Sequence, residues 1–296
     1  MLEPIASRWL APSDGFQAGS LPTVPPKTVP SGKKLKKMLA SCVDDLATLQ
    51  RKLYADNRYS VLLVFQALDA AGKDGTIRKV LSGVNPAGCQ VHSFKKPSPA
   101  ELDHDFLWRT TTALPQRGRI GVFNRSYYEE VLVVRAHPDW LTAQRLPRTI
   151  DSVTPESFWA ERMESIVEHE RHLARNGTVI LKFFLNVSRE EQARRLLDRI
   201  ENPERNWKFN SGDVAERAHW NEYQEAFASA ITETQRPWAP WYCIPADDKR
   251  YMRWAVADVV TRTLQSLPLR WPRLSPKEEA GLARSAAQLN SELGRD

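Results

Sequence analysis

The segment LDAAGKDGT at residues 68–76 carries residue types suited to binding phosphate. Gly72 and Gly75 let the backbone turn its N–H groups toward an anion, and a helix N-terminus behind them adds positive potential. Lys73 can reach a bridging or terminal phosphate oxygen. The apolar run before the segment predicts a strand, and TIRKVLSGV after it predicts a helix. This strand–loop–helix context favours a phosphate loop over a plain turn.

Two positions depart from the common loop pattern G-x-x-x-x-G-K-[ST]. Ala67 replaces the first glycine, and Asp74 replaces the Ser or Thr whose hydroxyl would bind magnesium. Asp69 lies too early to cap the helix, so we expect it to hold Mg²⁺, with Mn²⁺ as an alternative ion. For Asp74, a helix N-cap and a place in the phosphate pocket are equally good interpretations.

A second segment, FNRSYYEEVLVVR at residues 123–135, brings charges to the end of another predicted strand. We expect Arg125 to leave the strand end and face the phosphate loop. Glu129, Glu130 and Arg135 follow on a predicted helix. Taken alone, these charges would be a solvated helix face, but their place directly after a strand end favours a functional role.

A third segment, residues 194–217, is rich in basic side chains and suits a lid. A lid excludes water from phosphoryl transfer, and its cations neutralise the transferred group. A solvated basic helix is the alternative. The basic residues are Arg194, Arg195, Arg199, Arg205, Lys208 and Arg217.

Strands and helices alternate along the chain, which predicts a mostly parallel sheet with helices on both faces. The predicted strands are 60–67, 90–94, 119–123, 178–187 and 241–245. Ser98 with Glu101, and Ser188 with Glu191, predict capped helix starts, and Asp213 is expected to cap a helix that carries Trp220.

Composition narrows the class further. The 42 Lys and Arg against 36 Asp and Glu leave a net charge of +6, which favours a nucleotide, nucleic acid or phosphate polymer as partner. An idle basic surface explains the charge equally well. Cys42, Cys89 and Cys243 form no C-x-x-C pair, which argues against disulfides and a zinc knuckle. With no signal peptide and no apolar run long enough to span a membrane, we expect a cytoplasmic protein.

Several segments in the same order resemble the family-2 polyphosphate kinases, which have the P-loop kinase fold. The resemblance covers about residues 33–268. The matching segments are QALDAAGKDGTIRKVLSGVNPAG, GVFNRSYYEEVLVVR, TVILKFFLNVSREEQ, NPERNWKFNSGD, HWNEYQEAF and APWYCIPADDKRY. It implies an α/β three-layer sandwich with a five-stranded sheet and a helical lid at about 198–232, inside one domain at 33–272. An extended arm at 1–32 and a polar tail at 273–296 lie outside that domain.

The resemblance also implies site roles. The family loop reads D-x-x-G-K-D-G, so both aspartates belong to it. The implied catalytic residues are Asp69, Lys73, Arg125 and Glu130, of which Asp69 and Glu130 would be the magnesium ligands. The implied phosphate and nucleotide contacts are Gly72, Asp74, Gly75, Thr76, Glu129 and Arg135. The implied lid residues, which would bind the polymer, are Arg199, Lys208 and Arg217. With Glu129 after the two tyrosines, the segment RSYYEEVLVVR resembles that of the class III subgroup, which accepts nucleoside mono- and diphosphates.

The implied activity is reversible, Mg²⁺-dependent transfer from inorganic polyphosphate to AMP or ADP by a homo-oligomer, with no nucleic acid or membrane partner. Two alternatives remain open at this point. One is an ATP-dependent nucleotide or small-molecule kinase of the same fold, and the other is a non-catalytic protein that binds polyphosphate or nucleic acid.

Overall fold

The computed structural model describes residues 7–30, 32–147 and 155–294 of the chain. Its centre is a five-stranded sheet with the order β2-β3-β1-β4-β5, and every neighbouring pair is parallel. The strands are β1 (Ser60–Gln66), β2 (Cys89–Ser93), β3 (Ile120–Asn124), β4 (Thr178–Asn186) and β5 (Trp241–Pro245). All seven residues of β1 are buried, as expected for the central strand of a parallel sheet covered on both faces.

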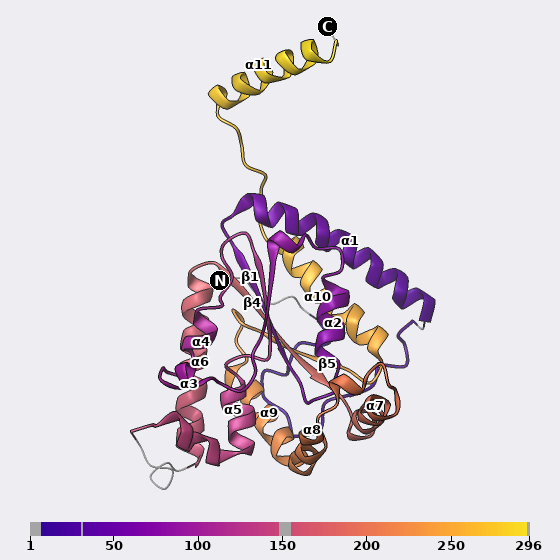
Figure 1. Ribbon diagram of the computed structural model, residues 1–296, viewed down its shortest axis with the longest axis vertical. Coiled ribbons are helices and arrows are strands. Elements are labelled where there is room, and N and C mark those ends of the chain that lie inside the picture. Colours follow the sequence, from indigo (N-terminus) through magenta and orange to yellow (C-terminus); the bar gives the residue numbers. More distant parts are fainter. Residues whose placement is uncertain (1–6, 31, 148–154, 295–296) are drawn as a thin grey trace.

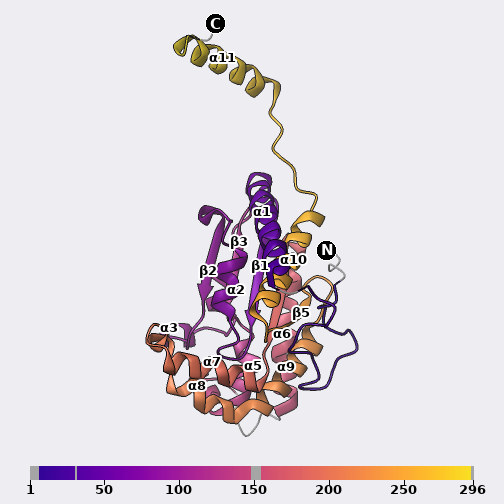
Figure 2. The same cartoon turned by 90° about the vertical axis from the view of Figure 1, so that its right-hand side faces the viewer.

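Helices cover both faces of the sheet (Figures 1 and 2). One face packs against α1 (Gly32–Asp56), α2 (Lys73–Val80) and α10 (Lys249–Ser266), and the other against α5 (Glu129–Ala136), α6 (Pro155–Arg175) and α9 (Trp220–Thr234). Alternate residues of β1 enter the two cores: Val61 and Leu63 one, Leu62 and Val64 the other. The predicted three-layer α/β fold is confirmed.

The order of the strands fixes where a ligand can bind. β1 and β3 are neighbours, but α2 follows β1 on one face whereas α5 follows β3 on the other. The two connections therefore leave a crevice at the carboxyl ends of β1 and β3, where open parallel sheets bind ligands. The loop at 67–72 and the turn at 125–128 border this crevice.

The segment between β4 and β5 is more broken than its sequence predicts. It contains α7 (Arg189–Glu201), η4 (Asn206–Lys208), α8 (Ser211–Ala215) and η5 (Glu216–His219) before α9. Asp213 caps no helix, so that prediction is wrong: Asn210 caps α8 through the N–H of Gly212, and Asp213 pairs with Arg199 instead. Because α9 packs against α5 and α6, the candidate lid is restricted to about residues 198–219.

Shorter helices complete the domain: η1 (Pro86–Gly88), α3 (Pro99–Leu102), α4 (Trp108–Thr111) and η2 (Pro138–Gln144). The capping box of Ser98 and Glu101 is confirmed at α3. Ser188 accepts the N–H of Glu191 at the start of α7, as predicted. The predicted helix after β3 starts only at Glu129, because residues 125–128 form a turn.

Residues 7–30 lie against the domain. Trp9 is buried, and an antiparallel bridge joins Leu10 to Tyr242 at the outer edge of β5. The Cys243 N–H donates to the Trp9 carbonyl at 2.7 Å, so this segment covers a sheet edge that would otherwise be open.

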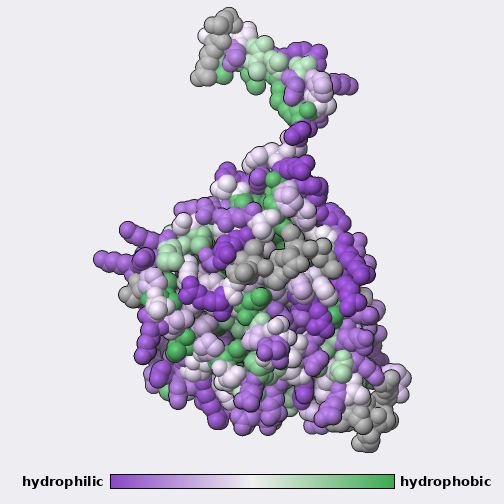
Figure 3. Space-filling view, turned by 180° about the vertical axis from the view of Figure 1, so that it is seen from behind, coloured by the Kyte–Doolittle hydropathy of each residue, from purple (hydrophilic) through white to green (hydrophobic). Residues whose placement is uncertain are grey.

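Most of the predicted polar tail is a helix, α11 (Pro276–Glu292), which begins at a capping box of Ser275 and Glu278. It projects away from the domain (Figure 2), and none of its residues is buried. Hydrophobic side chains lie on its surface (Figure 3). Within the described ranges, no helix combines the length and apolar character that a membrane crossing requires.

Candidate functional site

The phosphate loop joins β1 to α2 through a left-handed glycine. Gly72 is the N-cap of α2 with φ 108°, so the alternative that Asp74 caps this helix is wrong. A Cβ at Gly72 would also lie 3.2 Å from Cε of Met252. Lys73 folds back over the loop, and its Nζ donates to the Ala67 carbonyl at 2.7 Å. Burial lowers the pKa of Lys73, although the nearby Asp69 carboxylate opposes this shift.

The residues after Lys73 contact β3, the loop itself and α10. The Asp74 carboxylate accepts a hydrogen bond of 2.6 Å from Asn124 at the end of β3. The buried Thr76 hydroxyl donates to the Gly72 carbonyl, and Gly75 lies beside the Arg253 guanidinium.

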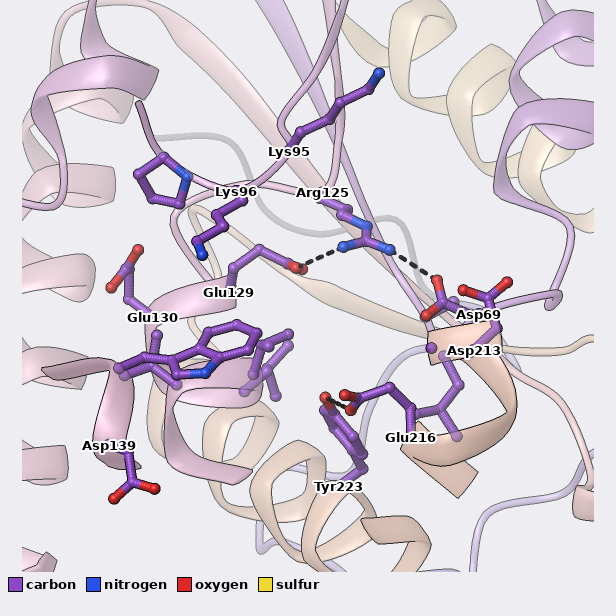
Figure 4. A pocket seen from close by; sticks show the side chains of 18 of the residues that line it. Asp69, Lys95, Lys96, Arg125, Glu129, Glu130, Asp139, Asp213, Glu216 and Tyr223 are labelled. Carbon is purple, nitrogen blue, oxygen red and sulfur yellow. Dashed lines mark hydrogen bonds and ion pairs between the residues drawn. The ribbon is translucent and has the colours of Figure 1, made fainter. Parts of the chain in front are cut away.

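Arg125 crosses the crevice from the end of β3 to the loop. Its Nη2 lies 2.7 Å from Oδ1 of Asp69, and its Nη1 lies 3.4 Å from Oε2 of Glu129 (Figure 4). The backbone is left-handed at Arg125 (φ 64°) and at Ala70 (φ 60°), a conformation that costs a non-glycine residue about 1–2 kcal/mol. Strain of this kind is concentrated at functional sites.

Charge around Arg125 is balanced within the site. Burial raises the pKa of Glu129, while the cations of Arg125 and Lys73 lower it. Burial lowers the pKa of Arg125, but the carboxylates of Glu129 and Asp69 outweigh burial and raise it overall. Two cations and two carboxylates therefore face each other where a phosphate chain would enter.

A pocket of about 650 Å³ opens from this cluster, large enough for a nucleotide. Its polar side includes Asp69, Lys95, Lys96, Arg125, Glu129, Asp213, Glu216, Arg217 and Tyr223, and its apolar side includes Leu132, Val133, Trp140, Trp220 and Phe227. Lys95 and Lys96 were missed from the sequence. The signal was present, because FKKP directly follows the end of β2 as Arg125 follows the end of β3.

Two expected site residues are engaged by partners outside the phosphate loop. Glu130 borders the pocket but is buried, and its carboxylate accepts hydrogen bonds from Arg162 at 3.1 Å and Gln144 at 2.7 Å. Arg135 donates to the Ser229 hydroxyl of α9 at 2.9 Å and does not line the pocket.

The proposed magnesium ligands are therefore not equivalent. Figure 4 shows Glu130 and Asp69 on opposite sides of the pocket, with Asp213 beside Asp69. Burial raises the pKa of Asp213, and the Asp69 charge raises it further. No group of three or more His, Cys, Asp or Glu side chains in the described part of the chain forms a metal centre. Asp69 still fits Mg²⁺, which commonly takes one or two carboxylates, water and substrate phosphates.

The candidate lid contacts the site through ion pairs and hydrogen bonds. Arg199 pairs with Asp213 at 2.8 Å, and Arg217 donates to the Gln192 side chain at 2.6 Å. Arg217 lines the pocket, whereas Lys208 is exposed and lies over the ring of Trp207.

Arg195 of α7 has a role that its place in a basic segment did not indicate. Its side chain is 6% exposed, and all its donor nitrogens are engaged. Nε bonds Glu191 at 2.8 Å, Nη1 bonds the Ala71 carbonyl at 2.6 Å, and Nη2 bonds the Ala246 carbonyl at 2.6 Å. The guanidinium thus ties the phosphate loop to the loop after β5.

A buried network supports the turn that presents Arg125. Lys182 in β4 pairs with Glu170 at 2.7 Å, and both side chains are 0% exposed. The Glu170 carboxylate also accepts the hydroxyls of Tyr127 at 2.9 Å and Tyr128 at 3.0 Å. The two tyrosines immediately precede Glu129, so the network holds the start of α5 against the sheet.

The phosphate loop, the crevice beside it and the all-parallel sheet define a P-loop kinase-like protein. Residues 30–269 match the family described as Polyphosphate kinase 2 (PPK2). The chain belongs to this family, whose members are phosphotransferase enzymes, as the sequence predicted.

Named relatives resemble the chain over most of its length. It is 50% identical to an ADP-polyphosphate phosphotransferase of Rhodopseudomonas palustris, over 92% of this chain and 93% of the relative. It is 46% identical to an AMP/ADP-polyphosphate phosphotransferase of Meiothermus ruber, over 77% of this chain and 80% of that relative. The crystal structure of Polyphosphate Kinase 2 from Arthrobacter aurescens superposes with a TM-score of 0.83 at 34% identity, covering 94% of this chain and 96% of that one.

Proposed function

We propose that this protein transfers the terminal phosphoryl group of inorganic polyphosphate to ADP and AMP, reversibly and with Mg²⁺. The observation that supports this most directly is the meeting of Lys73, Asp69 and Arg125 at one crevice, in a chain half identical to a polyphosphate phosphotransferase. The bond from the terminal phosphorus to its bridging oxygen would break, and a bond to an acceptor phosphate oxygen would form.

The residues have separate proposed roles. Lys73 and Arg125 bind phosphate oxygens and stabilise the charge of the transferred group, which is the main catalytic requirement of phosphoryl transfer. Asp69 holds Mg²⁺, which when bound would neutralise charge on the phosphates. The acceptor phosphate is already ionised, so no strong general base is needed. Arg199, Lys208 and Arg217 would bind the polymer as the lid closes.

The proposal also states which nucleotides accept the phosphoryl group. The two relatives differ in their names, one for ADP alone and the other for AMP and ADP. Glu129 would set acceptor breadth, because it lines the pocket and pairs with Arg125. We also propose a cytoplasmic enzyme, since its nucleotide substrates are cytoplasmic and its three cysteines are unpaired. That it is a homo-oligomer is proposed from the family resemblance alone.

The test is ATP formation, measured with luciferase, from long-chain polyphosphate, Mg²⁺ and either AMP or ADP. ATP from both acceptors, absent in Lys73→Ala, supports the proposal, and Glu129→Asn should then narrow the acceptor range. ATP from ADP alone would keep the enzyme and exclude AMP as an acceptor. Activity with ATP and AMP but none with polyphosphate would establish the ATP-dependent kinase instead.

A further inference from the structure

A second cavity, of about 360 Å³, lies at the end of the sheet opposite the phosphate loop. It is formed where the end of α1, the chain entering β1 and the chain leaving α10 meet. Its lining residues are Ala55, Asp56, Arg58, Arg270, Trp271, Pro272 and Arg273. In Figure 1 the linker to α11 leaves from this end, whereas α7 and α8 lie at the other.

Three arginines line this cavity, Arg58, Arg270 and Arg273, and two more, Arg117 and Arg119, contact residues beside it. We call these five the arginine face. Arg117 donates to the Arg58 carbonyl at 2.7 Å. The Arg119 guanidinium lies 4.5 Å from the centre of the Tyr54 ring, on the last turn of α1. Arginines from three separate parts of the chain thus bring like charges to one surface.

Within the described residues, one carboxylate forms an ion pair with an arginine of this face. Asp56, whose side chain is 1% exposed, pairs with Arg58 at 2.8 Å and accepts the Arg270 N–H. Arg58 also donates to the Pro268 carbonyl, so its position is fixed before any ligand arrives. Among the residues that the structure describes, the other four arginines form no ion pair with a carboxylate. The face therefore has a strong uncompensated positive charge.

We propose that the arginine face is a second binding site for long-chain polyphosphate, remote from the site of transfer. This inference rests on the proposed function, which supplies the polymer. Guanidinium groups bind phosphate oxygens through paired N–H donors, and a row of them suits a linear polyanion.

The separation of the two sites makes the inference specific for long chains. The seven residues of β1 separate them by about 23 Å at roughly 3.3 Å per residue. A short chain can contact one site only, whereas a long chain held at the arginine face keeps its free end at a high effective concentration near the phosphate loop.

The test compares two double variants with the same loss of charge. Arg270→Gln/Arg273→Gln removes two exposed arginines of the face, and Lys277→Gln/Arg284→Gln removes two charges from α11. Initial rates are measured with saturating ADP and Mg²⁺ over a range of long-chain or short-chain polyphosphate concentrations. Binding of labelled long-chain polyphosphate is measured separately, without nucleotide, so it does not depend on turnover.

For the arginine-face variant we expect the KM for long-chain polyphosphate to rise about threefold to tenfold, the range that two exposed charge contacts give. Its KM for short chains and its kcat should stay as in the wild type. The α11 variant should keep the wild-type KM for both chain lengths and the wild-type kcat. An unchanged KM for long chains, or an equal rise for both chain lengths, would overturn the inference. Arg117→Gln provides an independent second variant. If the wild-type protein binds the polymer but transfers no phosphate, the proposed function is refuted and the polymer-binding inference is not.

A nucleic-acid site would behave differently. Trp271 is 58% exposed beside the arginines, and single-stranded nucleic acids bind by stacking bases on such rings. Polyphosphate has no rings, so Trp271→Ala should leave its binding unchanged. If Trp271→Ala abolishes binding of a labelled RNA oligonucleotide that outcompetes polyphosphate in the wild type, the face is an RNA site and the inference is wrong.

Discussion

Arg125 and Asp69 form an ion pair of 2.7 Å across the crevice between β3 and β1, although 56 residues separate them in the sequence. The pair joins a proposed phosphate-binding cation to a proposed magnesium ligand. Bound phosphate would compete with Asp69 for the guanidinium, and bound Mg²⁺ would compete with Arg125 for the carboxylate. The two groups are thus kept in place, and neutralised, until both charged partners arrive.

Replacing Asp69 with asparagine should lower kcat by a factor of the order of 10² or more, the cost of losing one preorganised electrostatic group. The amide keeps the size of the side chain but loses the charge that Mg²⁺ requires. Steady-state rates across a Mg²⁺ titration check this, and the variant should need more Mg²⁺ for half-maximal rate. Asp45→Asn, on the exposed face of α1, is the matched control. A rate and Mg²⁺ requirement close to wild type in Asp69→Asn would show that Asp69 is not a metal ligand.

The features that the sequence predicts well are local ones. The strands follow from short buried apolar runs, and the Ser98 box at α3 needs only residues three apart. Positions that depend on distant partners were predicted poorly. Asp213 has the residue type of a cap, but Arg199 takes its carboxylate, so Asn210 caps the helix instead.

Two further site residues have partners on other helices, which the sequence does not indicate. Arg135 follows Glu129 by six residues, about 600° or 240° around α5, and its guanidinium binds Ser229 of α9 instead of lining the pocket. Glu130 was expected at the metal, but Arg162 on α6 takes its carboxylate, and no spacing in the sequence indicates that partner. The carbonyls that Arg195 binds come from loops about 50 and 125 residues away, which is beyond any local pattern.

Arg195 should be needed for the shape of the phosphate loop, because no other side chain presents five donors in one plane. Arg195→Lys keeps the charge but cannot reach both loops. We expect it to lower the free energy of unfolding by about 2–4 kcal/mol, through lost charged hydrogen bonds and unpaired buried carbonyls. Urea unfolding measures this.

The neighbouring Arg194→Lys is the control for Arg195, since the Arg194 side chain is 72% exposed and, among the described residues, pairs only with Glu191. It should change the free energy of unfolding by less than about 0.5 kcal/mol. Equal effects of the two variants would mean that the contacts of Arg195 with the loop carbonyls do not stabilise the domain.

The buried Lys182–Glu170 pair gives a prediction about stability. Lys182→Met leaves the Glu170 charge buried without its cation and should cost about 3–5 kcal/mol of unfolding free energy. Lys182→Met/Glu170→Leu removes both charges and should recover part of that loss. Denaturant unfolding of both variants measures these changes in the free energy of unfolding. A double variant less stable than the single one would show that Glu170 stabilises the tyrosines without Lys182.

The same pair should shape the pH dependence of stability. Burial lowers the pKa of Lys182 from 10.5 to about 8, despite the opposing charge of Glu170. Above pH 8 the unfolded chain therefore holds more protons at this lysine than the folded chain, so stability from Lys182 rises with pH and is lost as pH falls through about 8. Between pH 8 and 9.5 the wild type should gain of the order of 1–2 kcal/mol relative to Lys182→Met/Glu170→Leu. Parallel pH profiles for the two proteins would contradict the lowered pKa.

Ending the chain after Arg273 should leave the domain intact. The deletion removes α11, in which no residue is buried, so the free energy of unfolding should change by less than about 0.5 kcal/mol. Leu282, Leu289 and Leu293 are each more than half exposed, so their removal should also increase solubility. Thermal unfolding of both proteins at several concentrations checks this. If the full chain alone gains stability with concentration, these leucines pack against a second copy of the chain, and α11 is part of an oligomer interface.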